Sequence, residues 1–184
     1  MFLISFGVWF IDVAEQKNNA SCFKFPQLTM NVPEPALVAV EELAVWMHAI
    51  LPKIGAEKAS QSERSQVPFS TLIIVDSRDE EERNNTGYIR SSQSIPHVNF
   101  EDDDQADEQI NALLNSVAES PNPAFIFHCA YSQVRGPFSA RRFLSRCSVQ
   151  DKQPNVFILQ GGFNSWKQLS LQNELVSNFT MPPQ

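Results

Sequence analysis

The chain has 184 residues, of which 42% are hydrophobic, and it carries a formal net charge of −7. A chain of this length can bury most of its apolar surface in one core, so we expect a single domain. The acidic balance argues against a nucleic-acid partner, because such proteins use a basic face to displace counterions. Three cysteines without a CxxC spacing indicate reduced thiols in a cytoplasmic or nuclear protein, and no metal site.

The N-terminus, MFLISFGVWFIDV, is apolar but has no Lys or Arg before its apolar run and no small-residue cleavage site. As a helix its first eleven residues would rise about 16 Å, roughly half of a ~30 Å hydrocarbon core. We therefore expect no membrane span. Residues 1–34 are interpreted as an N-terminal extension that is poorly ordered or packs on the domain, with a membrane-targeting or signal-anchor role as the alternative.

The folded domain is expected over residues 35–178. Apolar residues repeat at the spacing of one helix face between 43 and 50, and Pro52 ends that predicted helix. Residues 55–68, GAEKASQSERSQVP, are polar and low in complexity, which predicts a mobile surface loop within the domain.

Three short segments are apolar at every position: LIIV at 72–75, AFIF at 124–127 and VFIL at 156–159. Such continuous hydrophobicity is typical of strands that are covered on both faces. Between these segments, 107–120 and 136–148 carry apolar residues at helical spacing. The alternation predicts an α/β fold, with a parallel sheet flanked by helices on both faces.

Acidic residues gather in two runs, DSRDEEER at 76–83 and EDDDQADE at 101–108. The second run precedes a predicted helix, where carboxylates interact with the positive end of the helix dipole and Asp caps free N–H groups. A docking surface for a basic partner is the alternative.

Cys129 follows the second apolar segment and precedes Arg135 by six positions. Ligands of open α/β sheets bind at the carboxyl ends of the strands. Gly136 and Pro137 open the next helix, so the loop from Cys129 to Val134 faces a helix N-terminus, which is an anion site. The positive end of the helix dipole and the guanidinium of Arg135 both favour the thiolate form of Cys129. We predict that Cys129 is a nucleophile and that Arg135 holds a tetrahedral oxyanion through paired N–H donors.

The remaining oxyanion-binding residues are predicted to be the neighbours of these two side chains, namely Ala130, Tyr131, Ser132, Gln133, Val134 and Gly136. Ser132 is a candidate donor to the thiolate or to the leaving atom. His128 is expected to hydrogen-bond the loop backbone and not to act as a base. Cys147 would lie about 16 Å from the loop along a helix, beyond the ~7 Å Cα separation of a disulfide, and is predicted to be a core thiol.

The stretch HCAYSQVRGP resembles the active-site loop of rhodanese-fold phosphatases of the cell-division-cycle-25 type and, more closely, that of the small eukaryotic arsenate reductases. VFILQGGFNSW is similar to a late strand and Gly-Gly-x-x-x-Trp turn of that fold. IIVDSRDEEERNNTGYIRSSQSIP is similar to an earlier motif, through Asp76, Arg78, Gly87, Ile89 and Ile95-Pro96. Tyr88, Ser91 and Ser92 depart from that motif and indicate a divergent member. The resemblance covers residues 36–170 and implies one rhodanese-like domain, in which His128, Asp76 and Arg78 support the loop.

The resemblance also bears on activity. Sulfurtransferases of this fold have an active loop one residue shorter than the seven residues from Cys129 to Arg135, which implies phosphate or arsenate as substrate here. The phosphatases carry an acid directly before the arginine, where this chain has Val134. Without it, a proton would come from Asp76, Asp79 or Glu80.

We therefore expect an arsenate reductase with accompanying phosphatase activity. It would bind no resident cofactor and would use glutathione or a glutaredoxin as co-reductant, with arsenate or a phosphoprotein as substrate. A protein tyrosine or dual-specificity phosphatase is the alternative. A sulfurtransferase and a non-catalytic docking module are further alternatives.

Overall fold

The computed structural model describes residues 34–51, 67–150, 152–172 and 179–180. All of these belong to one compact unit, Val32–Gln184. The predicted extension at 1–34 lies outside the described residues except for Glu34, and the predicted loop at 55–68 lies outside them except for its last two positions. Val67, one of those two, is buried in the core.

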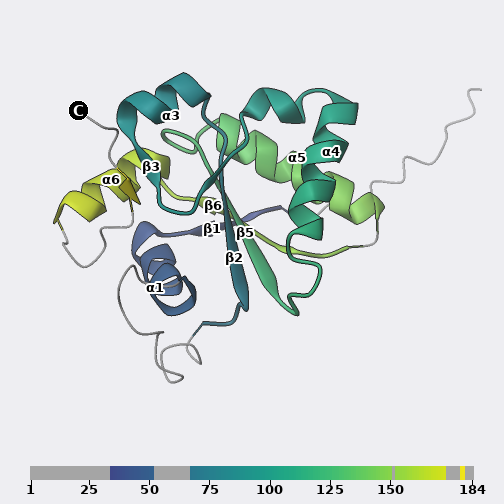
Figure 1. Cartoon of the computed structure of the whole chain (residues 1–184), viewed down its shortest axis with the longest axis horizontal. Coiled ribbons are helices and arrows are strands. Elements are labelled where there is room, and N and C mark those ends of the chain that lie inside the picture. Colours follow the sequence, from purple (N-terminus) through teal and green to yellow (C-terminus); the bar gives the residue numbers. More distant parts are fainter. Residues whose placement is uncertain (1–33, 52–66, 151, 173–178, 181–184) are drawn as a thin grey trace, which may run out of the picture. The chain divides into compact units, whose positions relative to one another are not determined.

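The main sheet has five strands, all parallel, in the order β1-β6-β5-β2-β4 (Figure 1). The three apolar segments form its three central strands, as predicted, because continuous hydrophobicity suits strands with no solvent-facing side. The strands are β1 (Ala36–Val38), β2 (Thr71–Asp76), β4 (Gln93–Ser94), β5 (Pro123–His128) and β6 (Asn155–Leu159).

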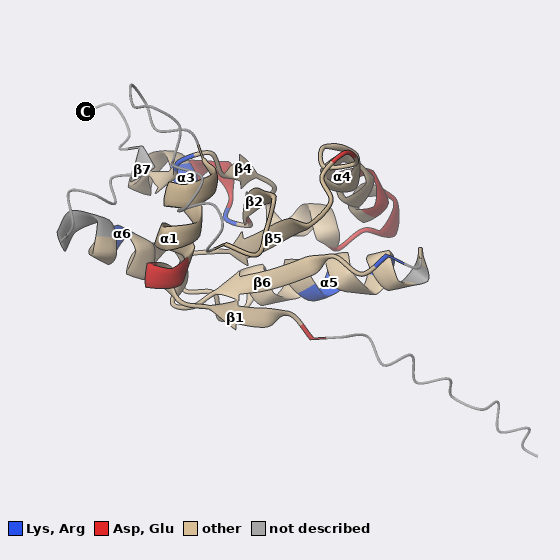
Figure 2. Cartoon of the chain, turned by 90° about the horizontal axis from the view of Figure 1, so that it is seen from below, with Lys and Arg blue, Asp and Glu red and all other residues tan. Residues whose placement is uncertain are grey.

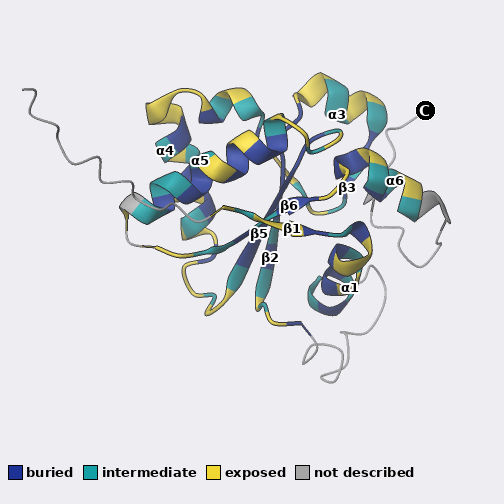
Figure 3. Cartoon of the chain, turned by 180° about the vertical axis from the view of Figure 1, so that it is seen from behind, coloured by how far each residue is buried: buried dark blue, intermediate teal, exposed yellow. Residues whose placement is uncertain are grey.

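Helices cover both faces of this sheet, which confirms the predicted layers. Alternate residues of β5 divide the core: Ala124 and Ile126 pack with α1 and α6, whereas Phe125 and Phe127 pack with α4 and α5. Figure 3 shows the buried strands between these helices, whose outer surfaces are exposed. The helices are α1 (Val40–Ile50), α4 (Asp103–Asn115), α5 (Arg135–Val149) and α6 (Gly162–Gln172).

Helix α4 begins at residue 103, four positions before the predicted start, and ends at residue 115. The Asp102 side chain caps it by accepting hydrogen bonds from the N–H groups of Asp104 and Gln105. The cap-and-dipole interpretation of the second acidic run is therefore confirmed, and the cap explains the earlier start.

Helix α3 (Glu80–Thr86) was not predicted, because its sequence EEERNNT has no apolar periodicity and none of its residues is buried. The helix is set by its ends. The Asp79 side chain accepts a hydrogen bond from the Glu82 N–H at 2.7 Å, and Gly87 follows the helix at a φ of 86°, which favours glycine. Figure 2 marks the acidic residues in red, and they lie near α3 and on α4.

The smaller elements complete the edge of the domain near α3. The 3-10 helix η1 (His97–Phe100) buries Phe100 beside Phe127 of the sheet. A separate two-stranded antiparallel sheet pairs β3 (Tyr88–Ile89) with β7 (Phe179–Thr180).

Cys147 lies on α5 and is fully buried, as predicted for a core thiol. Burial raises the pKa of this thiol to about 11, against a lowering by Lys152, so the thiolate is scarce near neutral pH.

We expect Cys147→Ala to cost about 1–2 kcal/mol of unfolding free energy, because it leaves a small cavity. Turnover should stay near the wild-type rate, as measured by urea unfolding and steady-state kinetics. A large loss of rate at unchanged stability would contradict the core assignment.

Candidate active site

The candidate site lies where the carboxyl ends of β2, β5 and β6 meet. Cys129 directly follows β5, and Arg135 is the first residue of α5, so the loop between them runs from a strand end to a helix start. Cys129 is 4% exposed. No side chain caps the first turn of α5, whose N–H groups are therefore available to an anion. The structure thus places the predicted nucleophile and arginine on one short loop.

Ser132 gives the loop its curvature. Its φ of 52° lies in the left-handed region, which residues other than glycine adopt at a cost of about 1 kcal/mol or more. The Ser132 hydroxyl oxygen is buried but has no hydrogen-bond partner among the described residues. A buried hydroxyl without a partner is costly, so a bound ligand is a natural partner for this group.

Gly136 allows α5 to start directly against the end of β5. A Cβ at this position would lie 3.0 Å from the carbonyl carbon of His128 and 3.1 Å from the backbone nitrogen of Cys129. A side chain would therefore push the helix N-terminus away from the nucleophile. Gly136 therefore positions the start of α5 beside Cys129.

The start of α6 supports the loop from the other side. The N–H of Phe163 donates to the carbonyl oxygen of Cys129 at 2.8 Å, and the N–H of Asn164 donates to that of Ala130 at 3.0 Å. Gly162, at a φ of 62°, lets the backbones approach so closely. The resemblance of VFILQGGFNSW to a Gly-Gly-x-x-x-Trp turn marked Gly161 and Gly162 as part of a motif but gave them no role at the site. These hydrogen bonds tie the first two carbonyl oxygens of the loop to the start of α6.

Gly162→Ala is expected to damage both stability and turnover. The new Cβ would lie 2.5 Å from the Cys129 carbonyl oxygen, and a positive φ is already strained for alanine. We expect a loss of about 2 kcal/mol or more in unfolding free energy. The matched control is Ser165→Ala in the same helix. Urea unfolding that leaves Gly162→Ala as stable as the control would show that the close approach is not needed.

Arg135 lies at the mouth of the loop, with its side chain 25% exposed. Its Nη2 is 2.7 Å from Oε2 of Glu82, and its Nη1 is 3.5 Å from Oδ2 of Asp79. Burial lowers the pKa of the guanidinium, but the hydrogen bond and charge of Glu82, and the nearby Cys129 and Asp79, outweigh it and raise the pKa. Glu82 was missed by the sequence reasoning, although its position three residues after Asp79 in an acidic run was a usable signal.

Asp76, Arg78 and His128 form a buried polar cluster that supports the loop. Arg78 holds both carboxylate oxygens of Asp76, at 2.9 and 2.6 Å. The same guanidinium donates to Thr86 and to the Gly87 carbonyl, and it lies 4.0 Å from the ring centre of Phe163. Arg78 therefore ties the end of β2 to α3 and to the helix that holds the loop.

The structure corrects the expectation that Asp76 could supply a proton. Asp76 is fully buried, and although burial acts to raise the pKa of its carboxyl, His128 when protonated, together with the hydrogen bonds and charge of Arg78, lowers it. Glu80 is exposed, and Arg135 pairs with Asp79 and Glu82 instead. Of the three expected donors, the structure brings Asp79 to the site.

His128 lies against the loop backbone. Its Nδ1 is 3.3 Å from the Cys129 carbonyl oxygen and 3.8 Å from Oδ1 of Asp76. Burial lowers the pKa of His128, more than the Asp76 charge raises it. The imidazole is thus neutral at neutral pH, and Arg78 is the dominant cation next to Asp76. This geometry fits a role in holding the backbone.

Apolar side chains surround the mouth of the loop. Tyr131 and Val134 are 61% and 73% exposed, and Phe138 in the first turn of α5 is 41% exposed. A groove of about 450 Å³ begins at the loop and continues along α5, lined by Gln133, Val134, Phe138, Arg141, Arg142 and Ser145. Exposed aromatic and aliphatic groups at a site are typical of contacts with a larger molecule.

The sequence pattern of the rhodanese-like domain family matches residues 57–169. The chain belongs to this family. Over 99 residues, 52% of its length, it is 36% identical to a protein from Arabidopsis thaliana named dual specificity phosphatase Cdc25, of which the match covers 62%. It is 32% identical over 99 residues to arsenate reductase 2.2 of Oryza sativa subsp. japonica, of which 69% is covered.

Solved rhodanese-like structures show the same fold. Ygr203w, described as a yeast protein tyrosine phosphatase of the rhodanese family, superposes with a TM-score of 0.59 at 22% identity, over 78% of this chain and 92% of that one. An As-Sb reductase from Leishmania major superposes with a TM-score of 0.54 at 20% identity, over 76% and 81%. The rhodanese-like α/β fold of this chain is therefore established.

Two further features are absent from the described parts of the chain, residues 34–51, 67–150, 152–172 and 179–180. Those parts hold no group of three His, Cys, Asp or Glu side chains arranged to bind a metal ion. No helix in them combines the length and hydrophobicity needed to cross a membrane.

Proposed function

We propose that this protein is a cysteine-thiolate enzyme that acts on a tetrahedral oxyanion, and that it reduces arsenate. The observation that carries the proposal is the loop from Cys129 to Arg135, which joins a buried thiol, an uncapped helix start and a guanidinium around one small space. The unpartnered Ser132 hydroxyl in that loop supports it. Relatives named as a phosphatase and as an arsenate reductase support the general class.

In the proposed reduction, the Cys129 thiolate attacks arsenic and an As–S bond forms while an oxygen leaves as water. A second thiol, from glutathione or a glutaredoxin, then resolves this adduct. The two thiols are oxidised to a disulfide, and arsenic accepts the two electrons, so arsenate becomes arsenite. The backbone N–H groups of the loop from Cys129 to Arg135 (the cradle) and the Arg135 guanidinium would stabilise the oxyanion charge throughout.

Phosphatase activity is the second candidate, and the surroundings of Arg135 favour it. Attack on phosphorus expels an alkoxide or phenoxide, which needs a proton. Position 134 is valine, but Asp79 and Glu82 bring carboxyl groups to the cradle mouth. The exposed side chains of Tyr131, Val134 and Phe138 would contact a protein or aryl substrate. A sulfurtransferase and a docking module remain alternatives that these features do not favour.

One side-by-side assay tests the proposal. Purified protein and Cys129→Ser would be offered arsenate with glutathione and glutaredoxin, an aryl phosphate, and thiosulfate with cyanide. We expect Cys129-dependent turnover with arsenate, and slower turnover with the aryl phosphate. Turnover of thiosulfate alone, or equal rates for both proteins, would contradict the proposed function.

A further inference from the structure

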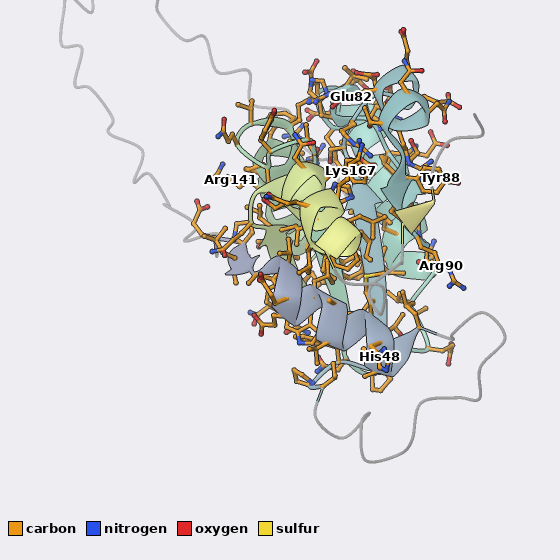
Figure 4. The ribbon with its side chains drawn as sticks, turned by 90° about the vertical axis from the view of Figure 1, so that its left-hand side faces the viewer. His48, Glu82, Tyr88, Arg90, Arg141 and Lys167 are labelled. Carbon is orange, nitrogen blue, oxygen red and sulfur yellow. The ribbon has the colours of Figure 1, made fainter. Side chains whose placement is uncertain are left out.

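Two carboxylates at the start of α3 pair with Arg135, the side chain that the proposed function assigns to oxyanion binding. Glu82 accepts from Nη2 of Arg135 at 2.7 Å, and Asp79 lies 3.5 Å from Nη1. Figure 4 shows Glu82 at the end of the molecule opposite His48 of α1. The Arg135 ion pairs therefore form at the same end of the sheet as the loop, between α3 and the first residue of α5.

The geometry of a guanidinium makes this occupancy consequential. An arginine can hold two oxygens side by side in two ways, through Nη1 with Nη2 or through Nε with Nη2. Both arrangements use Nη2, which is the nitrogen that Glu82 holds. An oxyanion bound in the first way shares Nη2 with Glu82 and Nη1 with Asp79, and one bound in the second way shares Nη2 with Glu82, so in both ways it meets a carboxylate already paired with Arg135.

The charges lead to the same result. Arg135 contributes one positive charge, whereas ionised Asp79 and Glu82 contribute two negative charges, so these three side chains carry a net charge of −1. A Cys129 thiolate adds another negative charge. An arriving oxyanion is thus attracted by the backbone N–H groups and the helix dipole, but it meets an arginine whose charge is already compensated.

We propose that Glu82, assisted by Asp79, competes with the substrate oxyanion for Arg135 and thereby sets the affinity of the site for that oxyanion. This inference rests on the proposed function. The pair keeps the affinity for free inorganic oxyanions low and eases release of the oxyanion product. Glu82 has the larger share, because its contact is shorter and its side chain is 27% exposed, against 60% for Asp79.

Neighbouring residues on α3 provide matched controls. Glu81 belongs to the same acidic run and is exposed, so Glu81→Gln removes the same formal charge away from Arg135. Glu82→Gln keeps the size and an acceptor oxygen while removing the charge. Asp79→Asn keeps a side chain that can cap α3, because asparagine caps helices as well as aspartate does.

The test is the dissociation constant for tungstate, an unreactive tetrahedral oxyanion, measured by titration calorimetry on the full chain at low salt. We expect Glu82→Gln to bind tungstate about tenfold more tightly than wild type, since a close, partly buried counter-charge is lost. Asp79→Asn should bind it about two- to threefold more tightly, as fits a more exposed group. Glu81→Gln should change binding by less than about twofold, because its charge is more distant and screened.

The outcomes separate this inference from the proposed function. Weaker binding in Glu82→Gln would mean that Glu82 holds Arg135 in its binding position, which overturns the competition. Equal tightening in Glu82→Gln and Glu81→Gln would reduce the effect to net charge and overturn it as well. If all four proteins bind no tungstate, the cradle and the proposed function fail together with this inference. If wild type binds tungstate and turns over substrate while Glu82→Gln binds no more tightly, the competition alone fails.

Discussion

Cys129→Ser is expected to lose turnover by about 10⁴-fold or more while the fold is preserved. A serine hydroxyl is not ionised near neutral pH, and the neighbouring imidazole of His128 faces the Cys129 carbonyl oxygen, 3.3 Å from its Nδ1, so it holds the loop backbone. The replacement is nearly isosteric, so the hydrogen bond from Phe163 to the carbonyl oxygen of residue 129 should remain. Steady-state kinetics with arsenate and with an aryl phosphate measure the loss.

Two controls make this loss specific. Cys147→Ala removes the buried thiol of α5 and should leave turnover near wild type. Tungstate should still bind Cys129→Ser, because the cradle N–H groups and Arg135 are unchanged. Residual turnover in Cys129→Ser close to the wild-type rate, with both proteins pure and folded, would remove the nucleophile from the mechanism.

The sheet was predictable from sequence because its central strands are apolar at every position. Those segments can only be buried between two layers, and they became β2, β5 and β6. The short strand β1 was missed because three residues carry no usable period, and its pairing with β6 is a long-range contact. Helix α3 was missed for a related reason: its ends define it, and its residues bury nothing.

The loop was predictable for a different reason, namely that all of its chemistry is contiguous in the sequence. The strand end, Cys129, Arg135 and the glycine that admits the helix lie within nine residues of one another. Glu82 and Gly162 reach the same place from distant segments, and only the tertiary fold brings them there. Asp76 shows the converse error, because a carboxylate at the correct strand end proved to be committed to a buried ion pair.

The charge around the loop links these observations. Three guanidinium groups stand near the site: Arg83 lies 3.5 Å from Asp76, and two closer pairings join Arg78 to Asp76 and Arg135 to Glu82 and Asp79. The pair of Arg78 with Asp76 is fully buried and fixed, so it serves the fold. The ion pairs of Arg135 with Glu82 and Asp79 are partly exposed, so these side chains can separate. The difference in burial is what makes Arg135 available to a ligand and Arg78 unavailable.

Arg135→Lys is expected to lower kcat/KM by about 10²-fold or more, which makes it the second large effect at this site. Lysine keeps the positive charge but replaces the paired N–H donors with a single ammonium. It would also remain within reach of Glu82, whose carboxylate competes for any cation there. The ammonium would therefore be neutralised by Glu82, and it would lack the planar, side-by-side pair of N–H donors that lets a guanidinium hold two oxygens.

The matched control is Arg141→Lys in the same helix, where the arginine is exposed and pairs with Glu34 at 2.8 Å. It should change kcat/KM for arsenate by less than about twofold, because an exposed ion pair contributes little and a small oxyanion does not extend along the groove that Arg141 lines. The double variant Arg135→Lys with Glu82→Gln separates charge from geometry. If the loss in Arg135→Lys arises from neutralisation alone, the second substitution restores turnover. If it arises from the missing donor pair, turnover stays low, and this is the result that an oxyanion cradle built around a guanidinium requires.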